Sequence, residues 1–263
     1  LTTSLAYMKA KGDNRISSAT FFTTMLDFTD PGELGVFIED EQIQGLEGKM
    51  DKDGYLEGSS MAGTFNLLRA NDLIWSFVVN NYLMGRDPFP VDLLYWNADS
   101  TRMPAEMHSF YLRNMYQENK LVEPGGIELD GVPIDLSKIA TPTMILSTRE
   151  DHIAPWKSTY AATQLYKGPV QFCLAGSGHI AGVVNPPANE KYGYWTAKDN
   201  PADPDDWLAG AEEKPGSWWP EWRKWIKKHA GGQIAARTPG DGKLKVIESA
   251  PGSYAATRFD EKD

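Results

Sequence analysis

The feature that most constrains the fold is a strand–helix–strand pattern in the second half of the chain. Residues 143–147 (TMILS) and 170–174 (VQFCL) are short apolar runs with the length and composition of buried strands. Residues 158–165, which lie between them, have the composition of a helix. Since strands that are joined through a helix run parallel in one sheet, the pattern predicts an α/β fold with helices on the faces of a parallel sheet.

The start of the chain shows the same alternation. Residues 1–8 place apolar side chains at helical spacing, and Gly12 ends that pattern. Residues 17–27 are rich in Thr and Phe and predict a buried strand. The first residue is Leu rather than Met, so we expect a fragment of a longer protein that begins at or within a helix.

The stretch between the two core segments breaks the alternation and has the character of an insertion. It contains predicted helices at 61–68, 72–83 and 104–120, and its many aromatic residues include Trp75 and Trp96. These aromatic side chains are interpreted as packing, with a lid or an interface that closes over a site as the alternative. The predicted parts are a core at 1–27, a cap at 28–139, a core at 140–231 and a peripheral tail at 232–263.

Two further segments belong to the second core part. Residues 186–215 are rich in Pro, Asn and Asp, which predicts a long surface loop. Residues 218–229 predict a helix in which tryptophans recur at spacings of three and four residues. Such a stripe indicates a helix face that packs on the sheet rather than a ligand site.

The charge, the apolar runs and the cysteine content indicate which partners, compartment and metal sites to expect. The formal net charge is −10, and an acidic surface argues against binding to nucleic acid or to an anionic membrane. No apolar run approaches the ~20 residues of a membrane-spanning helix. Cys173 is the only cysteine, so no internal disulfide can form and a reducing cytoplasm is expected. No Cys, His or carboxylate cluster has the spacing of metal ligands, and no metal site is predicted.

Two residues with potentially catalytic side chains follow the two predicted strands directly. Asp151 comes after 143–147, and His179 comes after 170–174. Because the carboxyl ends of parallel strands meet at one edge of a sheet, the carboxylate and the imidazole are expected to lie together. The carboxylate would then fix the tautomer of the imidazole and stabilise the imidazolium. Their order along the chain is that of an α/β-hydrolase, whose nucleophile lies on a strand-to-helix elbow, and this elbow is expected upstream of Leu1.

Other interpretations of these residues are simpler. An isolated Asp in a loop is commonly a turn former, and an isolated His is commonly structural or solvated. His152 competes with His179 for the carboxylate, but adjacent side chains on an extended segment point apart, so His152 is better placed to line the pocket. His108 and His229 lie in helical segments and are interpreted as structural.

No residue of the chain has the surroundings of a nucleophile. Cys173 lies in the middle of a predicted strand without the small residues of a strained elbow, and it is interpreted as a buried apolar residue. The segment 58–62 (GSSMA) is one glycine short of the Gly-x-Ser-x-Gly motif and precedes a helix rather than following a strand. The nucleophile is therefore expected outside this chain.

Several long motifs, in order and at the right spacing, resemble the polyhydroxyalkanoate synthases, and class I of that family most. They are an acid motif at 147–156 (STREDHIAPW), a histidine motif at 176–187 (GSGHIAGVVNPP), a tryptophan-rich segment at 216–222 (GSWWPEW), and segments at 23–28 (TTMLDF) and 69–75 (RANDLIW). The similarity covers about residues 1–230 and corresponds to the C-terminal half of the family's catalytic region.

The resemblance implies an α/β-hydrolase fold with an inserted cap, here without the first strands and the nucleophile elbow. It implies polymerisation of (R)-3-hydroxyacyl-CoA, in the first place 3-hydroxybutyryl-CoA, with release of CoA and with no cofactor. Asp151 and His179 would act beside a cysteine, and His152, Trp156 and Ala181 are candidate substrate-binding residues because they lie near those two in the sequence. Family members form dimers through the cap and occupy polyester granules in the cytoplasm, where granule-associated proteins are further partners.

One departure from the family is large. Its Gly-x-Cys-x-Gly-Gly elbow is absent from residues 1–263, so the fragment alone is expected to be inactive and, with an exposed sheet edge, to fold poorly. Two alternatives stay open. A serine esterase or polyester depolymerase of the same fold would share Asp151 and His179 but would need a serine elbow upstream. A non-catalytic, granule-associated protein would use the cap as an interaction surface.

Overall fold

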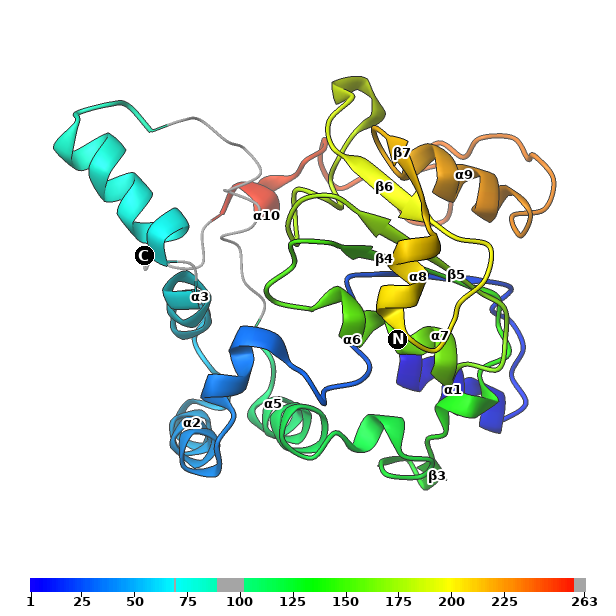
Figure 1. Ribbon diagram of the computed structural model, residues 1–263, viewed down its shortest axis with the longest axis horizontal. Coiled ribbons are helices and arrows are strands. Elements are labelled where there is room, and N and C mark those ends of the chain that lie inside the picture. The colour runs from blue at the N-terminus through cyan, green and yellow to red at the C-terminus, as the bar shows by residue number, and fades with distance from the viewer. Residues whose placement is uncertain (69, 89–101, 258–263) are drawn as a thin grey trace.

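The computed structural model describes residues 1–68, 70–88 and 102–257, and Figure 1 shows the arrangement of their helices and strands. A five-stranded sheet lies at the centre, in the order β1, β4, β5, β6, β7. Its strands are β1 (Ala19–Phe22), β4 (Thr143–Thr148), β5 (Val170–Ala175), β6 (Gly193–Thr196) and β7 (Glu212–Pro215). β1, β4 and β5 are parallel, as predicted, whereas β6 and β7 extend the sheet in antiparallel orientation.

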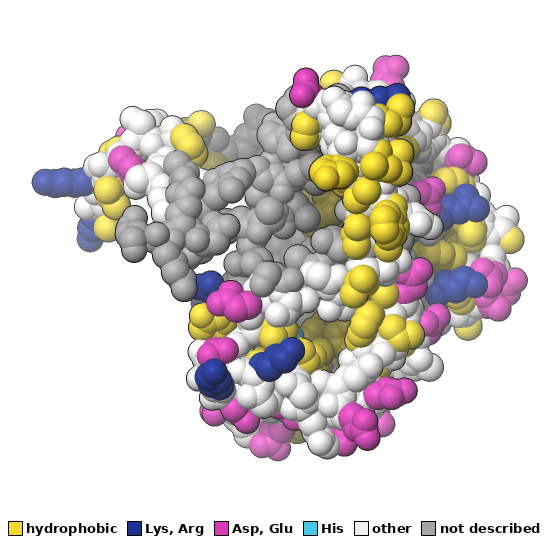
Figure 2. Space-filling model, turned by 90° about the vertical axis from the view of Figure 1, so that its left-hand side faces the viewer, with side chains coloured by type: hydrophobic (Ala, Val, Ile, Leu, Met, Phe, Trp, Pro, Cys, Tyr) yellow, Lys and Arg dark blue, Asp and Glu magenta, His cyan; other side chains and the backbone are white. Residues whose placement is uncertain are grey.

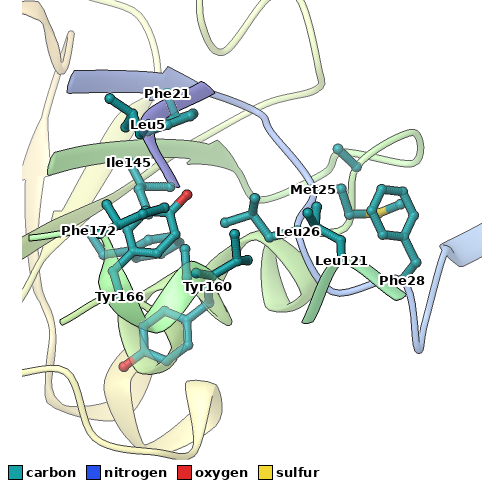
Figure 3. Packing of buried hydrophobic residues seen from close by; sticks show 14 of the residues in the cluster. Leu5, Phe21, Met25, Leu26, Phe28, Leu121, Ile145, Tyr160, Tyr166 and Phe172 are labelled. Atoms are coloured by element: carbon teal, nitrogen blue, oxygen red, sulfur yellow. The ribbon is translucent and has the colours of Figure 1, made fainter. Parts of the chain in front are cut away.

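The parallel strands are apolar because both faces of the sheet are covered. All six residues of β4 are buried, and so are the last four of β5. Side chains of β4 alternate between the faces, so that Ile145 packs into a larger hydrophobic cluster while Met144 and Leu146 pack into a smaller one. Figure 3 shows the larger cluster, where Ile145 lies with Phe21 of β1 and Phe172 of β5. All three predicted strands are confirmed, although β1 is shorter than predicted.

Helices cover both faces of the sheet. The larger cluster receives side chains from α1 (Thr2–Ala10), α6 (Trp156–Tyr160), α7 (Ala162–Leu165) and α8 (Pro204–Gly210). On the other face, α9 (Trp219–Lys227) packs on the smaller cluster, where Trp218 and Trp225 join Cys173. The predicted packing of the tryptophan stripe on the sheet is therefore confirmed.

The prediction of a long surface loop at 186–215 is wrong. The segment contains β6, α8, β7 and a short 3-10 helix, η7 (Pro187–Asn189). Its polar composition has a structural reason, because β7 is an edge strand with three of its four residues exposed. Asp203 caps α8 by accepting a hydrogen bond from the N–H of Asp205, and Pro204 is the first residue of that helix. The Pro and Asp residues that indicated a loop therefore begin a helix.

The predicted cap region is largely helical. It contains η1 (Gly32–Phe37), α2 (Asp40–Asp53), α3 (Gly58–Leu68), η2 (Asn71–Trp75), η3 (Val78–Leu83), α5 (Ala105–Tyr111), η4 (Leu112–Gln117) and η5 (Lys120–Val122). η2, η3 and η4 are π-helical, and η1 and η5 are 3-10 helices. The three predicted helices are confirmed, whereas α2 was not predicted. Figure 1 shows α2 and α3 to one side of the sheet. Trp96 lies outside the described residues, and the boundaries of the cap stay a prediction.

The remaining elements are short. They are the antiparallel pair β2 (Glu128–Leu129) and β3 (Val132–Pro133), the 3-10 helix η6 (Leu136–Lys138), and α10 (Ser253–Ala256) in the tail. Residues 232–252, all of which are described, form neither helix nor strand, in keeping with a peripheral tail. Within the described ranges, no helix has the length and apolar character needed to cross a bilayer.

Candidate catalytic site

Asp151 and His179 lie together at the carboxyl ends of β4 and β5. The register of the two strands pairs Thr148 with Ala175, so the loops that follow begin side by side. Nδ1 of His179 is 2.7 Å from Oδ2 of Asp151, which is hydrogen-bonding distance. The spatial pairing predicted from the sequence is confirmed, and the catalytic role of the two residues stays a prediction.

The side chain of Asp151 has no exposed surface, and both carboxylate oxygens accept hydrogen bonds. Oδ1 accepts from the backbone N–H groups of Ile153 and Ala154, each at 2.9 Å. Oδ2 accepts from Oγ1 of Thr148 at 3.3 Å as well as from His179. Burial alone would raise the pKa of Asp151, but the hydrogen bonds from His179 and the backbone outweigh burial and hold this pKa below its usual range. Asp151 is therefore ionised at neutral pH.

An ionised Asp151 fixes the tautomer of His179. Because Oδ2 is an acceptor, Nδ1 carries the proton that points to it, and Nε2 is the nitrogen that can take up another proton. The side chain of His179 is 26% exposed, so the ring is accessible while its carboxylate partner is buried. The arrangement can accept a proton at Nε2 and stabilise the positive charge that results.

Backbone hydrogen bonds join the two loops that carry the pair. The N–H of Arg149 donates to the carbonyl of Ala175 at 2.8 Å, and the N–H of Glu150 donates to the carbonyl of Ser177 at 3.1 Å. Ser177 has a φ of +75°, and this left-handed conformation costs a non-glycine residue about 1–3 kcal/mol. The contacts between the loops thus hold Ser177 in a strained conformation two residues before His179.

Proteins with related sequences are known in several bacteria. The chain is 53% identical over 258 residues to the poly(3-hydroxyalkanoate) polymerase subunit PhaC of Rhizobium meliloti, and the match covers 98% of this chain and 42% of that relative. It is 44% identical over 264 residues to the protein of the same name from Cupriavidus necator, covering 98% of this chain and 45% of the relative. This chain is related in sequence to part of the poly(3-hydroxyalkanoate) polymerases.

Poly(3-hydroxyalkanoate) polymerase 1 of Ectopseudomonas oleovorans is more distant, at 36% identity over 258 residues that cover 98% of this chain and 46% of the relative. The chain thus spans less than half the length of these polymerases. No protein-family model matches it. The recognition of polyhydroxyalkanoate synthase motifs is confirmed, while the assignment to class I and to the C-terminal half of the catalytic region stays a prediction.

The three residues of this chain that were predicted to bind substrate lie in different surroundings. His152 is half-buried beside Asp151, and Ala181 is exposed in the loop of His179. Trp156 is buried in α6, where its ring packs against three other aromatic rings of the larger cluster. Trp156 therefore has a packing role in the core. Substrate binding by His152, Trp156 and Ala181 stays a prediction.

The single cysteine of the chain, Cys173, lies in the interior of the protein. Cys173 has no exposed surface and lies in the smaller hydrophobic cluster. Burial raises the pKa of its thiol and so disfavours the thiolate that nucleophilic attack requires. The interpretation of Cys173 as a buried apolar residue is confirmed. The segment 58–62 lies at the start of α3, and among the described residues no group of three or more His, Cys, Asp or Glu could hold a metal ion.

The two histidines that were interpreted as structural lie in packed environments. His108 is buried in α5, and burial lowers its pKa. His229 follows α9 and packs on Trp225, with 4.8 Å between the ring centroids. Both positions support the structural interpretation.

Sequence reasoning missed the residues that hold the pair in place. Thr148, the last residue of β4, donates to Asp151, and Gly182 lies directly against Thr148. The hydroxyl of Thr148, at the end of the strand and three residues before Asp151, was a sequence signal for a hydrogen bond to that carboxylate. The indole N–H of Trp218 donates a hydrogen bond to the carbonyl of Gly182, in the histidine motif, although Trp218 lies 36 positions further along the chain. No local sequence pattern indicates that contact.

Proposed function

We propose that the full-length protein polymerises (R)-3-hydroxyacyl-CoA, with 3-hydroxybutyryl-CoA as the expected substrate, into polyhydroxyalkanoate and releases CoA. The observation that carries this proposal is the 2.7 Å contact between Nδ1 of His179 and the buried carboxylate of Asp151, in a chain whose relatives are named poly(3-hydroxyalkanoate) polymerases. A base that is oriented by a carboxylate is what the activation of a thiol for acyl transfer requires.

The full-length protein is also proposed to have an α/β-hydrolase fold with residues 28–139 as an inserted cap. Three parallel strands, with Asp151 before His179 at the ends of two of them, support this fold. The nucleophile would be a cysteine on a strand-to-helix elbow outside residues 1–263, since Cys173 is buried within β5.

The first half-reaction forms an acyl-enzyme. The cysteine thiol gives its proton to Nε2 of His179, and the thiolate attacks the thioester carbonyl. Backbone N–H groups would stabilise the oxyanion that develops. The bond between the acyl carbon and the CoA sulfur then breaks, and CoA leaves as a thiol after His179 returns the proton to it. CoA is part of the substrate, and neither a cofactor nor a metal ion is proposed.

The second half-reaction forms the ester bond. The 3-hydroxyl of the incoming unit attacks the acyl-enzyme, His179 takes the hydroxyl proton, and the cysteine sulfur receives that proton as the thioester breaks. Asp151 would either orient His179 or help to deprotonate the hydroxyl. Its side chain has no exposed surface and both of its oxygens already accept hydrogen bonds, which supports the orienting role.

The proposed partners follow from the family and from the exposed apolar surface. We propose a homodimer formed through the cap, and a location on polyester granules in the cytoplasm, where granule-associated proteins bind as well. Large apolar side chains in the cap region, including Trp75, Phe77 and Tyr82, are exposed and support a contact surface there. Hydrophobic side chains also form a band on the face that Figure 2 shows. Binding to nucleic acid and membrane insertion are not proposed.

The test is the release of CoA from (R)-3-hydroxybutyryl-CoA by the purified full-length protein, measured with a thiol reagent alongside the polymer formed. CoA and polymer are expected together, and His179→Gln is expected to abolish both. Hydrolysis of simple esters without CoA release would overturn the proposal in favour of a serine esterase or depolymerase. Granule binding without any CoA release would overturn it in favour of a non-catalytic protein.

A further inference from the structure

Two tryptophan side chains bind the loop that carries the histidine of the site, here called the histidine loop (residues 176–185). The indole N–H of Trp218 donates to the carbonyls of Gly182 and Val183, each at 3.1 Å. The indole N–H of Trp219 donates to the same carbonyl of Val183, also at 3.1 Å. The second half of the histidine loop is therefore fixed from outside by side-chain donors.

This half of the loop is coupled closely to His179. The N–H of Gly182 donates to the carbonyl of Gly178 at 2.9 Å, which closes a turn around His179. A Cβ at Gly182 would lie 2.5 Å from the carbonyl oxygen of Gly176 and 2.5 Å from Cγ2 of Thr148, so the loop is in tight contact with itself and with β4. Because the turn is closed and tightly packed, a shift of its second half moves the imidazole relative to its carboxylate partner.

The indole of Trp218 is itself fixed to the sheet. Trp218 is 4% exposed and lies in the smaller hydrophobic cluster with Leu146 and Cys173. The centroid of its aromatic ring is also 5.4 Å from that of Phe22 at the end of β1. Trp219 is 38% exposed, so it reaches the loop from the surface. Trp218 thus connects the histidine loop to the sheet from inside, and the ring of Trp219 packs against that of Trp218, with 6.3 Å between the centroids.

The hydrogen bonds give a reason for tryptophan at these positions. A leucine or phenylalanine could fill the apolar space but has no donor, whereas an indole combines a large apolar surface with an N–H that reaches the loop carbonyls. We propose that Trp218 and Trp219 are positioning residues for His179, which hold the histidine loop where Nδ1 meets Asp151. The inference rests on the proposed function, because its kinetic consequence requires His179 to be the base.

The experiment compares Trp218→Phe with Trp222→Phe in the full-length protein. Trp222 is a matched control because it lies one turn after Trp218, which is the N-cap of α9, and packs on the same cluster. Its indole N–H, however, donates to Thr20 of β1 rather than to the histidine loop. For Trp218→Phe, kcat for CoA release is expected to fall roughly 10- to 100-fold with KM nearly unchanged, the effect of a small misplacement of a catalytic group. Trp222→Phe is expected to change kcat by less than about twofold, as fits the loss of a hydrogen bond that does not orient the base.

A spectroscopic measurement separates positioning from general damage. In protein with 15N-labelled histidine, the proton on Nδ1 of His179 is assigned by comparison with His179→Gln. In Trp218→Phe this proton is expected to exchange faster with solvent, and in Trp222→Phe it is expected to behave as in the wild type. Trp219→Phe, an exposed substitution that removes a single bond, is expected to show the same change to a smaller extent, and it decides the matter if Trp218→Phe does not fold.

The outcomes are distinct. Equal behaviour of Trp218→Phe and Trp222→Phe in both kinetics and exchange overturns the inference, as does unchanged exchange in Trp219→Phe where Trp218→Phe fails to fold. A wild-type protein that releases no CoA, but whose Nδ1 proton still responds to Trp218→Phe alone, supports the positioning role and overturns the proposed function instead.

Discussion

Nδ1 of His179 lies 2.7 Å from Oδ2 of Asp151, although the two residues are 28 positions apart in the chain. The carboxylate is completely buried, whereas the imidazole is 26% exposed. The buried carboxylate is thus placed to orient the imidazole, and the imidazole itself has accessible surface. We expect this combination to serve acid–base catalysis by His179.

Asp151→Asn is expected to lower kcat for CoA release on the order of 10⁴-fold, with little change in KM. The amide has nearly the shape of the carboxylate, but it can donate a hydrogen bond to Nδ1 and so favours the wrong tautomer. Steady-state kinetics of the full-length protein measure the effect. The control is Asp135→Asn, the same chemical change at a residue that caps η6, and an equal loss in both variants would refute the orienting role.

The stability of the predicted cap is expected to depend on Glu47 at acid pH. Hydrogen bonds from Arg113 and Ser109 lower the pKa of Glu47 to about 2, and Nη2 of Arg113 lies 2.6 Å from Oε2 of Glu47. Since the folded-state pKa is below that of the unfolded chain, the ion pair stabilises the fold above about pH 4.5 and is lost as the pH falls towards 2. Urea unfolding of wild type and Glu47→Gln at several pH values measures this.

The difference in unfolding free energy between wild type and Glu47→Gln should be constant near neutral pH and shrink between about pH 4.5 and 2. A difference that does not vary with pH would contradict the assigned role of Glu47. The carboxylate is partly exposed to solvent, so the neutral-pH difference is expected to be only about 1 kcal/mol.

Gly182→Ala is expected to displace the histidine loop. The new Cβ would come within 2.5 Å of Cγ2 of Thr148 and of the carbonyl oxygen of Gly176, and overpacking of this kind costs about 1–3 kcal/mol. A lower Tm together with a lower kcat is the expected result. Gly210→Ala is the matched control, because a Cβ there meets no atom within 4 Å, and equal effects of the two variants would contradict the close packing described here.

The thiol of Cys173 is expected to resist alkylation in the native protein and to react once the protein is unfolded. Its side chain is inaccessible, and burial raises its pKa. Cys173→Ala should therefore keep CoA release within about twofold of wild type and cost about 1 kcal/mol of stability. The measurement is alkylation followed by peptide mapping. Rapid alkylation of Cys173 in the native protein would contradict the burial of this side chain.

The sequence predicted the parts of the fold that depend on continuous burial. β4 and β5 lie inside the sheet, so their apolar residues identified them, and the residues that follow them identified Asp151 and His179. β7 was missed because an exposed edge strand has no apolar pattern. α2 was missed because only Ile43 and Met50 of its residues are buried, although its capping box was a local signal.

The surroundings of the site were less predictable than the pair itself. Trp156 is close to Asp151 in sequence, but its side chain is buried in the larger hydrophobic cluster, and closeness along the chain did not indicate this packing. The bonds from Trp218 to the histidine loop connect residues that no local pattern relates. Contacts of this kind depend on how distant elements pack, and a single sequence does not report them.

The most direct test of a cysteine nucleophile is to locate the acyl group on the full-length protein. The full-length protein is incubated with (R)-3-hydroxybutyryl-CoA, quenched in acid, digested and mapped by mass spectrometry. We expect a thioester on a cysteine outside residues 1–263, none on Cys173, and a large loss of the adduct in His179→Gln. An acyl group on Cys173, or on a serine, would contradict the proposal that Asp151 and His179 serve a cysteine nucleophile from another part of the protein.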